Sequence, residues 1–395
     1  MQNFKDFKKE RIKEVAEKYG FDVLIGSLPE NVFYISDFKS ISHRILNRTS
    51  AFALFNCKNE QISAAIPCAD VATFIEQNEN LDIVCFGEFY FSFNKDMSPS
   101  SDSIKHITQN SFESPVEGLI EAIKKTRVTK GRIGLDESRV TPQIWNTLVN
   151  NFPNIHFIPA EGIFSEIKKI KHKTEIDKLE QSATIAEQAI HKALSKLELG
   201  MTEEELSKLY VEEVVHLGAQ PYFNVITEGE RTAFADTINT SNTILEGSLL
   251  RFDFGCIYDN YRSDLARTAI VGRGSKKMEE YYEHILRGEN DLINSIKPDV
   301  TAGEIYNIAM KSVREGIPHY ERQHVGHGIG LEVYDYPVLG EGVNESLKEN
   351  MVLCVETPYY EIGWGGVQVE DTLVVTDNGY RLLTKKSRDL IRIGG

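Results

Sequence analysis

The sequence predicts a two-domain protein, with an α/β domain over residues 1–160 and an α+β domain over residues 161–395. The chain has 395 residues, which is enough for two domains of ordinary size. In its first part, short apolar runs alternate with helical patterns, as in a sheet whose faces are covered by helices. In its second part, amphipathic helices come in pairs and precede apolar strands that carry Asp or Glu. We therefore place the domain boundary near residues 159–164.

The first domain is predicted to begin with a helix over residues 4–18, whose apolar residues lie near one face. Gly20 is a suitable C-terminal stop, because glycine readily adopts the left-handed conformation that ends helices. The predicted strands of this domain are 21–26, 50–56, 62–67, 82–87, 132–136 and 155–159. The later helices are predicted at 69–77, 116–126 and 142–150. Residues 92–114 are polar and are expected to form a loop.

Capping signals mark the helices of the second domain. Each signal is a threonine followed three positions later by an acid, and the pairs are Thr174 with Asp177, Thr202 with Glu205, and Thr301 with Glu304. The first pair precedes an apolar stripe over residues 176–197, and the second helix is expected to close at Gly218. A further helix is predicted over residues 276–296.

The composition argues against several classes of protein. The net charge of −15 disfavours a nucleic-acid partner, because phosphate binding requires clustered Lys and Arg. No apolar run approaches the roughly 20 residues of a membrane span, and the charged N-terminal helix is unlike a signal peptide. The cysteines are few, odd in number and mostly inside apolar runs, which favours a reduced cytoplasmic protein. They are Cys57, Cys68, Cys85, Cys256 and Cys354.

The strand-like residues 249–268 carry the first two candidate site residues, Asp253 and Asp264. Because side chains alternate between the faces of a strand, Asp253 points away from the face that Phe252 and Phe254 share. An unpaired carboxylate in such surroundings costs several kcal/mol. We therefore expect a cation beside Asp253.

Three further candidates lie downstream in similar surroundings. His327 stands between glycines in VGHGIG, Glu356 ends the run MVLCVE, and Glu370 ends GGVQVE. Four carboxylates and one imidazole form a donor set that suits hard or borderline divalent ions, and five ligands indicate two ions rather than one. Cys354 shares the face of Glu356, but we expect it to be a packed core thiol.

The motifs DFG-x8-D-x-x-RT, GHGIG and VED carry these five residues in the order Asp, Asp, His, Glu, Glu. In this order and spacing the chain resembles the family of prolidase, aminopeptidase P and methionine aminopeptidase, whose catalytic domain has the pita-bread fold. Residues 22–38, DVLIGSLPENVFYISDF, also resemble the N-terminal domain of the creatinase and prolidase branch. The resemblance implies a creatinase-like N-terminal domain, a pita-bread catalytic domain and a homodimer.

The resemblance also implies a role for each ligand. Asp253 would hold one divalent ion, His327 with Glu356 would hold the other, and Asp264 and Glu370 would bridge the pair. Mn²⁺ is the first expectation, with Co²⁺, Zn²⁺ or Fe²⁺ as alternatives. A hydroxide shared by the two ions would attack an amide carbonyl, and Glu356 would handle the proton.

Three departures from the family pattern lie on the substrate side. A family histidine normally stands about 17 residues before the first Asp, where this chain has Asp236. A second normally stands seven residues after the metal-binding histidine, where this chain has Tyr334. Gln368 stands where relatives often carry Arg before the last Glu, which suggests that a carboxylate-binding cation is missing. Tyr334 and Asp236 are therefore candidate catalytic residues, since a tyrosine hydroxyl still donates and an acid accepts from a cation.

Three functions remain open from the sequence. The first is a metal-dependent amide hydrolase with Xaa-Pro peptides as its default substrate. The second keeps the metals but acts on a small non-peptide amide or amidine, and the third is a binding protein without catalysis. Because the three departures make the pocket more acidic, we expect weak activity on Xaa-Pro dipeptides and better turnover of longer peptides or cationic amides. Trp364 is expected either at the pocket mouth or in packing.

Overall fold

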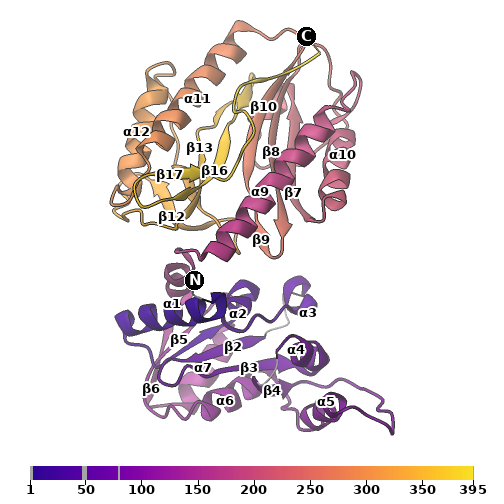
Figure 1. Ribbon diagram of the computed structural model, residues 1–395, viewed down its shortest axis with the longest axis vertical. Coiled ribbons are helices and arrows are strands. Elements are labelled where there is room, and N and C mark those ends of the chain that lie inside the picture. The colour runs from indigo at the N-terminus through magenta and orange to yellow at the C-terminus, as the bar shows by residue number, and fades with distance from the viewer. Residues whose placement is uncertain (1–2, 47–50, 79–80, 395) are drawn as a thin grey trace. The chain divides into compact units, whose positions relative to one another are not determined.

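The structure is a computed structural model that describes residues 3–46, 51–78 and 81–394 (Figure 1). The chain divides into two compact units, Met1–Lys168 and Lys169–Gly395. The sequence analysis placed the domain boundary between residues 160 and 161, whereas the helix α8 (Glu161–Lys168) belongs to the first unit.

The first unit contains a six-stranded sheet with the order β4-β3-β2-β1-β5-β6. Its strands are β1 (Val23–Gly26), β2 (Phe52–Asn56), β3 (Ile62–Pro67), β4 (Asp82–Phe86), β5 (Gly131–Leu135) and β6 (Ile155–Pro159). All six predicted strands are therefore confirmed, although residue 50 of the second prediction lies outside the described residues. The central strands are buried on both faces, as the near-continuous apolar runs predict.

The helices of the first unit follow local signals. They are α1 (Phe4–Tyr19), α2 (Pro29–Ser36), α3 (Ile41–Ile45), η1 (Cys68–Asp70), α4 (Val71–Gln77), α5 (Pro99–Gln109), α6 (Pro115–Lys125), α7 (Pro142–Asn151) and α8. Gly20 ends α1 with a left-handed φ of 72°, as predicted. Helix α6 begins with a capping box formed by Ser114 and Glu117.

Four helices of this unit, α2, α3, α5 and α8, were not predicted. Helix α5 lies within the expected loop 92–114, where Ser98 caps its N-terminus and Pro99 occupies its first turn. None of its residues is buried, so no apolar stripe marks it in the sequence. Helix α2 is fixed by a distant residue, since the buried Asp136 accepts hydrogen bonds from the backbone N–H of Leu28 and from the side chain of Asn31.

The cysteine prediction is partly wrong. Cys68 and Cys85 form a disulfide, because β3 and β4 pair in parallel and bring the two Cα atoms to 5.4 Å. The sequence places these residues 17 positions apart and gives no sign of this pairing. Cys57, Cys256 and Cys354 are free and buried, as expected for packed thiols.

The second unit is built on a ten-stranded sheet whose main path is β12-β11-β13-β16-β10-β8-β7. The strands on this path are β7 (Gln220–Glu228), β8 (Leu249–Tyr258), β10 (Leu265–Val271), β11 (His324–Gly328), β12 (Asp335–Gly340), β13 (Val352–Glu356) and β16 (Glu370–Val375). The short strands β9 (Tyr261–Arg262), β17 (Tyr380–Leu382) and β18 (Ile391–Ile393) pair at its sides, and β14 (Tyr359–Glu361) pairs with β15 (Gly365–Val367).

Two helix pairs pack on two halves of this sheet (Figure 1). They are α9 (Lys173–Leu194) with α10 (Glu203–His216), and α11 (Lys276–Ser295) with α12 (Ala302–Arg314). Phe252 and Phe254 of β8 join the core under α9 and α10, while Leu353 and Val355 of β13 join the core under α11 and α12. The residues between them therefore point to the opposite face, as the period of 2 requires.

The capping predictions for these helices hold in two cases and fail in one. Thr202 with Glu205 and Thr301 with Glu304 form capping boxes that begin α10 and α12. Helix α9 instead begins at Lys173 and is capped by His172, whose ring Nδ1 accepts from the N–H of Thr174. Among the described residues, no helix combines the length and apolarity that crossing a bilayer requires.

We predict that His43 makes the first unit sensitive to mild acid. The side chain is buried, and burial together with the charge of Arg139 lowers the pKa of His43 to about 4. In the unfolded chain the imidazole takes up its proton near pH 6.5. The unfolded state therefore binds more protons between these two values, and stability falls as the pH drops from about 6.5 to about 4.

The test is urea unfolding of the wild type and His43→Gln at pH 7 and pH 4.5. The wild type should lose up to about 3 kcal/mol more than the variant over this interval. His156→Gln, at an exposed position of β6, serves as the control. Equal losses in all three proteins would show that His43 does not titrate on unfolding.

Candidate metal centre

Strand register aligns three of the predicted ligands in one row across the sheet. Asp253 on β8 pairs with Ala266 on β10, which pairs with Glu370 on β16, which in turn pairs with Glu356 on β13. All of these residues point away from the helices, because their strand neighbours fill the apolar cores. The sheet therefore gathers carboxylates on one face.

Asp264 and His327 complete the group from neighbouring positions. Asp264 directly precedes β10, and its Oδ2 lies 3.6 Å from Nε2 of His327. Nδ1 of His327 lies 2.9 Å from the carbonyl oxygen of Gly328, so this nitrogen donates and Nε2 is left as the ligand atom. Burial lowers the pKa of His327 to about 4, which keeps the imidazole neutral. The structure thus brings all five predicted ligands together.

An arginine side chain and an amide side chain contact the carboxylate of Asp253. Its Oδ2 lies 3.4 Å from Nη1 of Arg251 and accepts a hydrogen bond of 3.2 Å from Nε2 of Gln368. Burial raises the pKa of Asp253 to about 6, with the Arg251 guanidinium opposing this rise and the charge of Glu356 adding to it. The side chain is 21% exposed, so one edge of the carboxylate remains open to the cavity.

Glu356 is flanked by two nitrogen-bearing side chains. Its Oε1 lies 3.4 Å from Nη2 of Arg322 and 3.3 Å from Nδ1 of His324. Burial raises the pKa of Glu356, and the Arg322 and Arg251 guanidinium groups partly oppose this rise. Glu356 therefore sits between the acid cluster and the cations of the site.

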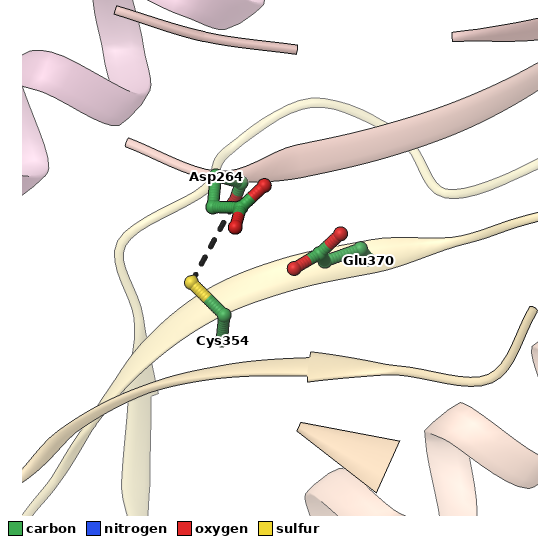
Figure 2. Close-up of side chains that lie close together, drawn as sticks. All are labelled: Asp264, Cys354 and Glu370. Carbon is green, nitrogen blue, oxygen red and sulfur yellow. Dashed lines mark hydrogen bonds between the residues drawn. The ribbon is translucent and has the colours of Figure 1, made fainter. Parts of the chain in front are cut away.

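Asp264 and Glu370 lie close together beside Cys354 (Figure 2), and among the described residues no arginine or lysine forms an ion pair with either carboxylate. Burial and the charges of nearby carboxylates, among them Glu356, raise the pKa of both groups well above the ordinary range. Ligand atoms of Asp264, Glu370 and Cys354 all lie within 4.8 Å of one another. This crowding of buried acids fits a divalent cation, because a cation would satisfy charges that the protein itself leaves unpaired.

Cys354 is placed as a packed thiol that also borders the acids. It lies opposite His327 in the register, and its Sγ donates to the backbone oxygen of Asp264 at 3.6 Å, the contact drawn in Figure 2. The Sγ atom also lies 3.5 Å from Oγ1 of Thr372. Burial raises the pKa of Cys354 well above its usual range, so the thiol stays protonated. The expectation of a core thiol agrees with these contacts.

The five ligands line one cavity of about 580 Å³. Its wall also contains Asp236 and Tyr334, the two residues that stand where relatives carry histidines. Asp236 follows η2 (Gly229–Ala233) in an irregular loop and is exposed. The ring of Tyr334 stacks on that of His327, with centroids 3.8 Å apart and planes 21° apart. Both candidate residues thus border the space where a substrate would lie.

Three basic residues of the site were not predicted from the sequence. Arg322 and His324 line the cavity, and the fully buried Arg251 lies directly behind Asp253. The cation expected beside Asp253 is Arg251, and the Arg322 guanidinium lines the cavity although position 368 carries Gln. His324 was not predicted because it lies three residues before His327. In an ideal strand, residues at this odd spacing point to opposite faces of the sheet. A register irregularity between the two brings both to the cavity.

Gly326 makes that irregularity possible. Its φ of 144° favours glycine, and a Cβ atom there would lie 2.3 Å from the backbone oxygen of Cys354. Trp364, by contrast, does not line the cavity. It packs against Tyr281 and Tyr359, and Nζ of Lys277 lies 4.3 Å from the centroid of its ring. Trp364 therefore has the packing role that the sequence analysis gave as the alternative.

Comparison with known families agrees with this architecture. A model of metallopeptidase family M24 matches residues 177–377, and a model of the creatinase/prolidase N-terminal domain matches residues 8–170. These matches confirm the predicted fold class, a creatinase-type N-terminal domain followed by a pita-bread catalytic domain.

Individual relatives extend over most or all of the chain. The Xaa-Pro dipeptidase of Pyrococcus furiosus is 33% identical over 253 residues, which cover 62% of this chain and 72% of the relative. The Xaa-Pro dipeptidase of Pyrococcus horikoshii is 28% identical over 394 residues, or 98% and 100% of the two chains. The solved structure of an Xaa-Pro dipeptidase from Bacillus anthracis has the same fold, with a TM-score of 0.82, 24% identity and coverage of 99% and 100%.

We predict that the Asp264→Asn variant loses at least one divalent ion. The carboxylate lies at the centre of the acid cluster, so its replacement by a neutral amide removes charge from the ligand set. Wild type and variant are incubated with Mn²⁺, Co²⁺ or Zn²⁺, freed of excess ion, and measured by elemental analysis. Asp377→Asn, on the exposed turn after β16, is the matched control. Wild-type protein that retained no ion, or a variant as metal-rich as the control, would contradict this assignment.

Proposed function

The chain belongs to metallopeptidase family M24, and on that premise we propose that it hydrolyses the peptide bond before proline in short Xaa-Pro peptides. The observation that carries this proposal is the convergence of Asp253, Asp264, His327, Glu356 and Glu370 on one cavity. A binding protein without catalysis would have no use for four buried carboxylates that cost stability when unpaired. The relatives named Xaa-Pro dipeptidase supply the default substrate.

Two divalent ions are part of the proposal, and Asp253, Asp264, His327, Glu356 and Glu370 would hold them. The ligand set is rich in oxygen and has one imidazole, which favours Mn²⁺ and allows Co²⁺, Zn²⁺ or Fe²⁺. When bound, such ions supply an activated water and polarise the carbonyl of the substrate. The side chains around them must orient the peptide, accept a proton and stabilise developing charge.

We propose that Glu356 accepts the proton. Its carboxylate lies at the cavity wall, and Arg322 and His324 both approach the same oxygen, Oε1. The Arg322 guanidinium holds this oxygen, which leaves the other oxygen of Glu356 to face the reacting groups. Burial already raises the pKa of Glu356, which makes it a better proton acceptor than an exposed glutamate.

We propose that Tyr334 donates a hydrogen bond to the carbonyl oxygen of the substrate. Its stacking on His327 ties the ring to a metal ligand, and its hydroxyl is a donor whose pKa is raised by burial and by nearby carboxylates such as Glu356. The hydroxyl therefore stays protonated at neutral pH. This role is the one that the missing family histidine would otherwise fill.

The charged groups outside the ligand set match a short peptide with free ends. Arg322 provides a guanidinium for a peptide carboxylate, and the exposed Asp236 provides an acid for a peptide ammonium. This pairing favours dipeptides more than the sequence alone suggests, because the motif has Gln368 where relatives often carry a carboxylate-binding Arg. A small cationic amide is the second candidate, favoured by the excess of carboxylates over guanidinium groups in the cavity wall.

We predict that the metal-loaded protein hydrolyses an Xaa-Pro dipeptide with kcat/KM of about 10⁴ M⁻¹s⁻¹ or more. The C-terminal amide of the same dipeptide should be cleaved roughly ten times less well, because it loses a charge-assisted contact with Arg322. Release of free proline or proline amide measures both reactions. In Arg322→Gln the preference for the free carboxylate should disappear, and taking the ratio of the two rates cancels any general effect on the site.

A panel of substrates separates the alternatives. Hydrolysis of a small cationic amide in preference to every peptide, reduced in Asp236→Asn, would favour the second candidate. Hydrolysis of Xaa-Pro tripeptides but not dipeptides would restore the expectation drawn from the sequence. No hydrolysis of any member with any of the four metals would contradict the proposed function.

We also predict that Tyr334→Phe lowers kcat by roughly 10- to 1,000-fold, because it removes one aimed hydrogen bond. Bound metal, measured by elemental analysis, should not change, since the stacked ring remains. A kcat equal to that of the wild type on the best substrate would show that the hydroxyl does not reach the reacting carbonyl.

A further inference from the structure

Arg251 is a buried charge at the edge of the metal centre. It is 0% exposed and heads the largest fully buried side chains among the described residues. It lies on β8 two positions before Asp253, so the two side chains emerge on the same face of the strand. A buried guanidinium is tolerated only when partners satisfy its N–H groups.

Three of these partners are backbone carbonyls from one loop. Nε of Arg251 donates to the oxygen of Thr232 at 2.9 Å, and Nη2 donates to the oxygens of Phe234 and Ala235 at 2.7 and 2.9 Å. The loop continues directly into Asp236 and forms part of the cavity wall. A single guanidinium therefore fixes the backbone that positions Asp236.

The remaining nitrogen reaches the ligand set. Nη1 donates to Oε1 of Gln368 at 2.8 Å and lies 3.4 Å from Oδ2 of Asp253. Gln368 in turn donates from Nε2 to the same Oδ2 at 3.2 Å. The hydroxyl of Tyr360 also lies 3.2 Å from Oε1 of Gln368. One oxygen of Asp253 is thus held by two donors, and Nε2 of Gln368 also lies 3.5 Å from Oε2 of Glu370.

We propose that Arg251 is a positioning residue with two separable tasks, which couple the metal centre to the substrate wall. Its Nη1 end, together with Gln368, orients the carboxylate of Asp253 for metal binding. Its Nε and Nη2 ends hold residues 232–235 and thereby place Asp236 at the cavity. This inference rests on the proposed metal centre, but its test needs no substrate.

Gln368 offers a way to separate the two tasks. The amide of Gln368 contacts both Arg251 and Asp253. An arginine at position 368, two residues before β16, would therefore bring a guanidinium close to Asp253. Such a guanidinium would take up the space that Arg251→Leu leaves near Asp253. It would not restore the three hydrogen bonds to the loop, because those come from the β8 side chain.

The experiment compares wild type, Arg251→Leu, Arg251→Lys and the double variant Arg251→Leu/Gln368→Arg, each stripped of metal. Mn²⁺ binding is measured by titration calorimetry, and hydrogen exchange is measured over residues 229–238. Arg251→Leu should weaken Mn²⁺ binding by about 10- to 100-fold, the usual effect of removing a group that orients a ligand. The double variant should recover most of that loss while both variants exchange faster than wild type in the loop.

Arg251→Lys and a control complete the design. A lysine keeps the charge but cannot reach all the partners of a guanidinium, so metal binding should be largely kept and loop exchange raised. Arg231→Leu removes another guanidinium from the same loop, one that contacts Glu203 and Ile238 rather than the ligands, and should leave Mn²⁺ binding unchanged.

Two results would overturn the proposal: folded Arg251→Leu that binds Mn²⁺ as tightly as wild type, or loop exchange that is the same in every variant. If Arg251→Leu does not fold, the same readouts from Arg251→Lys decide, and unchanged loop exchange there overturns it equally. Failure of the peptidase proposal would appear separately, as normal Mn²⁺ binding without hydrolysis of any Xaa-Pro peptide.

Discussion

Repulsion among buried carboxylates is the constraint around which the second unit is built. Register across β8, β10, β16 and β13 places Asp253, Glu370 and Glu356 in one row, and Asp264 enters from the loop before β10. Each strand has apolar neighbours on its other face, so the row cannot turn toward solvent without unpacking a helix pair. The sheet therefore fixes like charges close together, and only cations relieve them.

Two arginine side chains of the protein lie beside this row of carboxylates. Arg251 contacts Asp253 and Arg322 contacts Glu356, whereas no guanidinium in the described part of the chain pairs with Asp264 or Glu370. The negative charge is therefore balanced better at Asp253 and Glu356 than at Asp264 and Glu370. The proposed divalent ions would supply the positive charge that these two carboxylates lack.

A second buried network supports the same strands from the far side of Glu370. Arg267 on β10 donates to the backbone oxygen of Glu370 at 2.7 Å and to Asp371 at 2.8 Å, and so joins β10 to β16 where they carry ligands. Nearby, Glu289 of α11 is fully buried, and burial with the charge of Asp371 raises its pKa well above the ordinary range. This carboxyl group therefore takes up a proton more readily than an exposed glutamate does.

Much of this could be predicted from the sequence, because it depends on local patterns. Period-2 alternation identified the face of Asp253, and the threonine capping boxes identified α10 and α12. What escaped prediction depends on contacts distant in sequence or on irregular backbone. The disulfide between Cys68 and Cys85 requires the parallel pairing of β3 with β4, and the place of His324 requires a register shift in β11.

The arginines show most clearly why a missing motif residue need not mean a missing charge. Gln368 suggested a lost cation, because relatives often carry Arg at that point of the motif. In the folded chain Arg251, 117 positions away, places Nη1 2.8 Å from Gln368 and 3.4 Å from Asp253. A guanidinium beside Asp253 can thus come from β8, as Arg251 does here, or from position 368, where relatives often carry Arg. The positive charge beside Asp253 therefore depends on side chains from segments distant in sequence, and no single motif determines it.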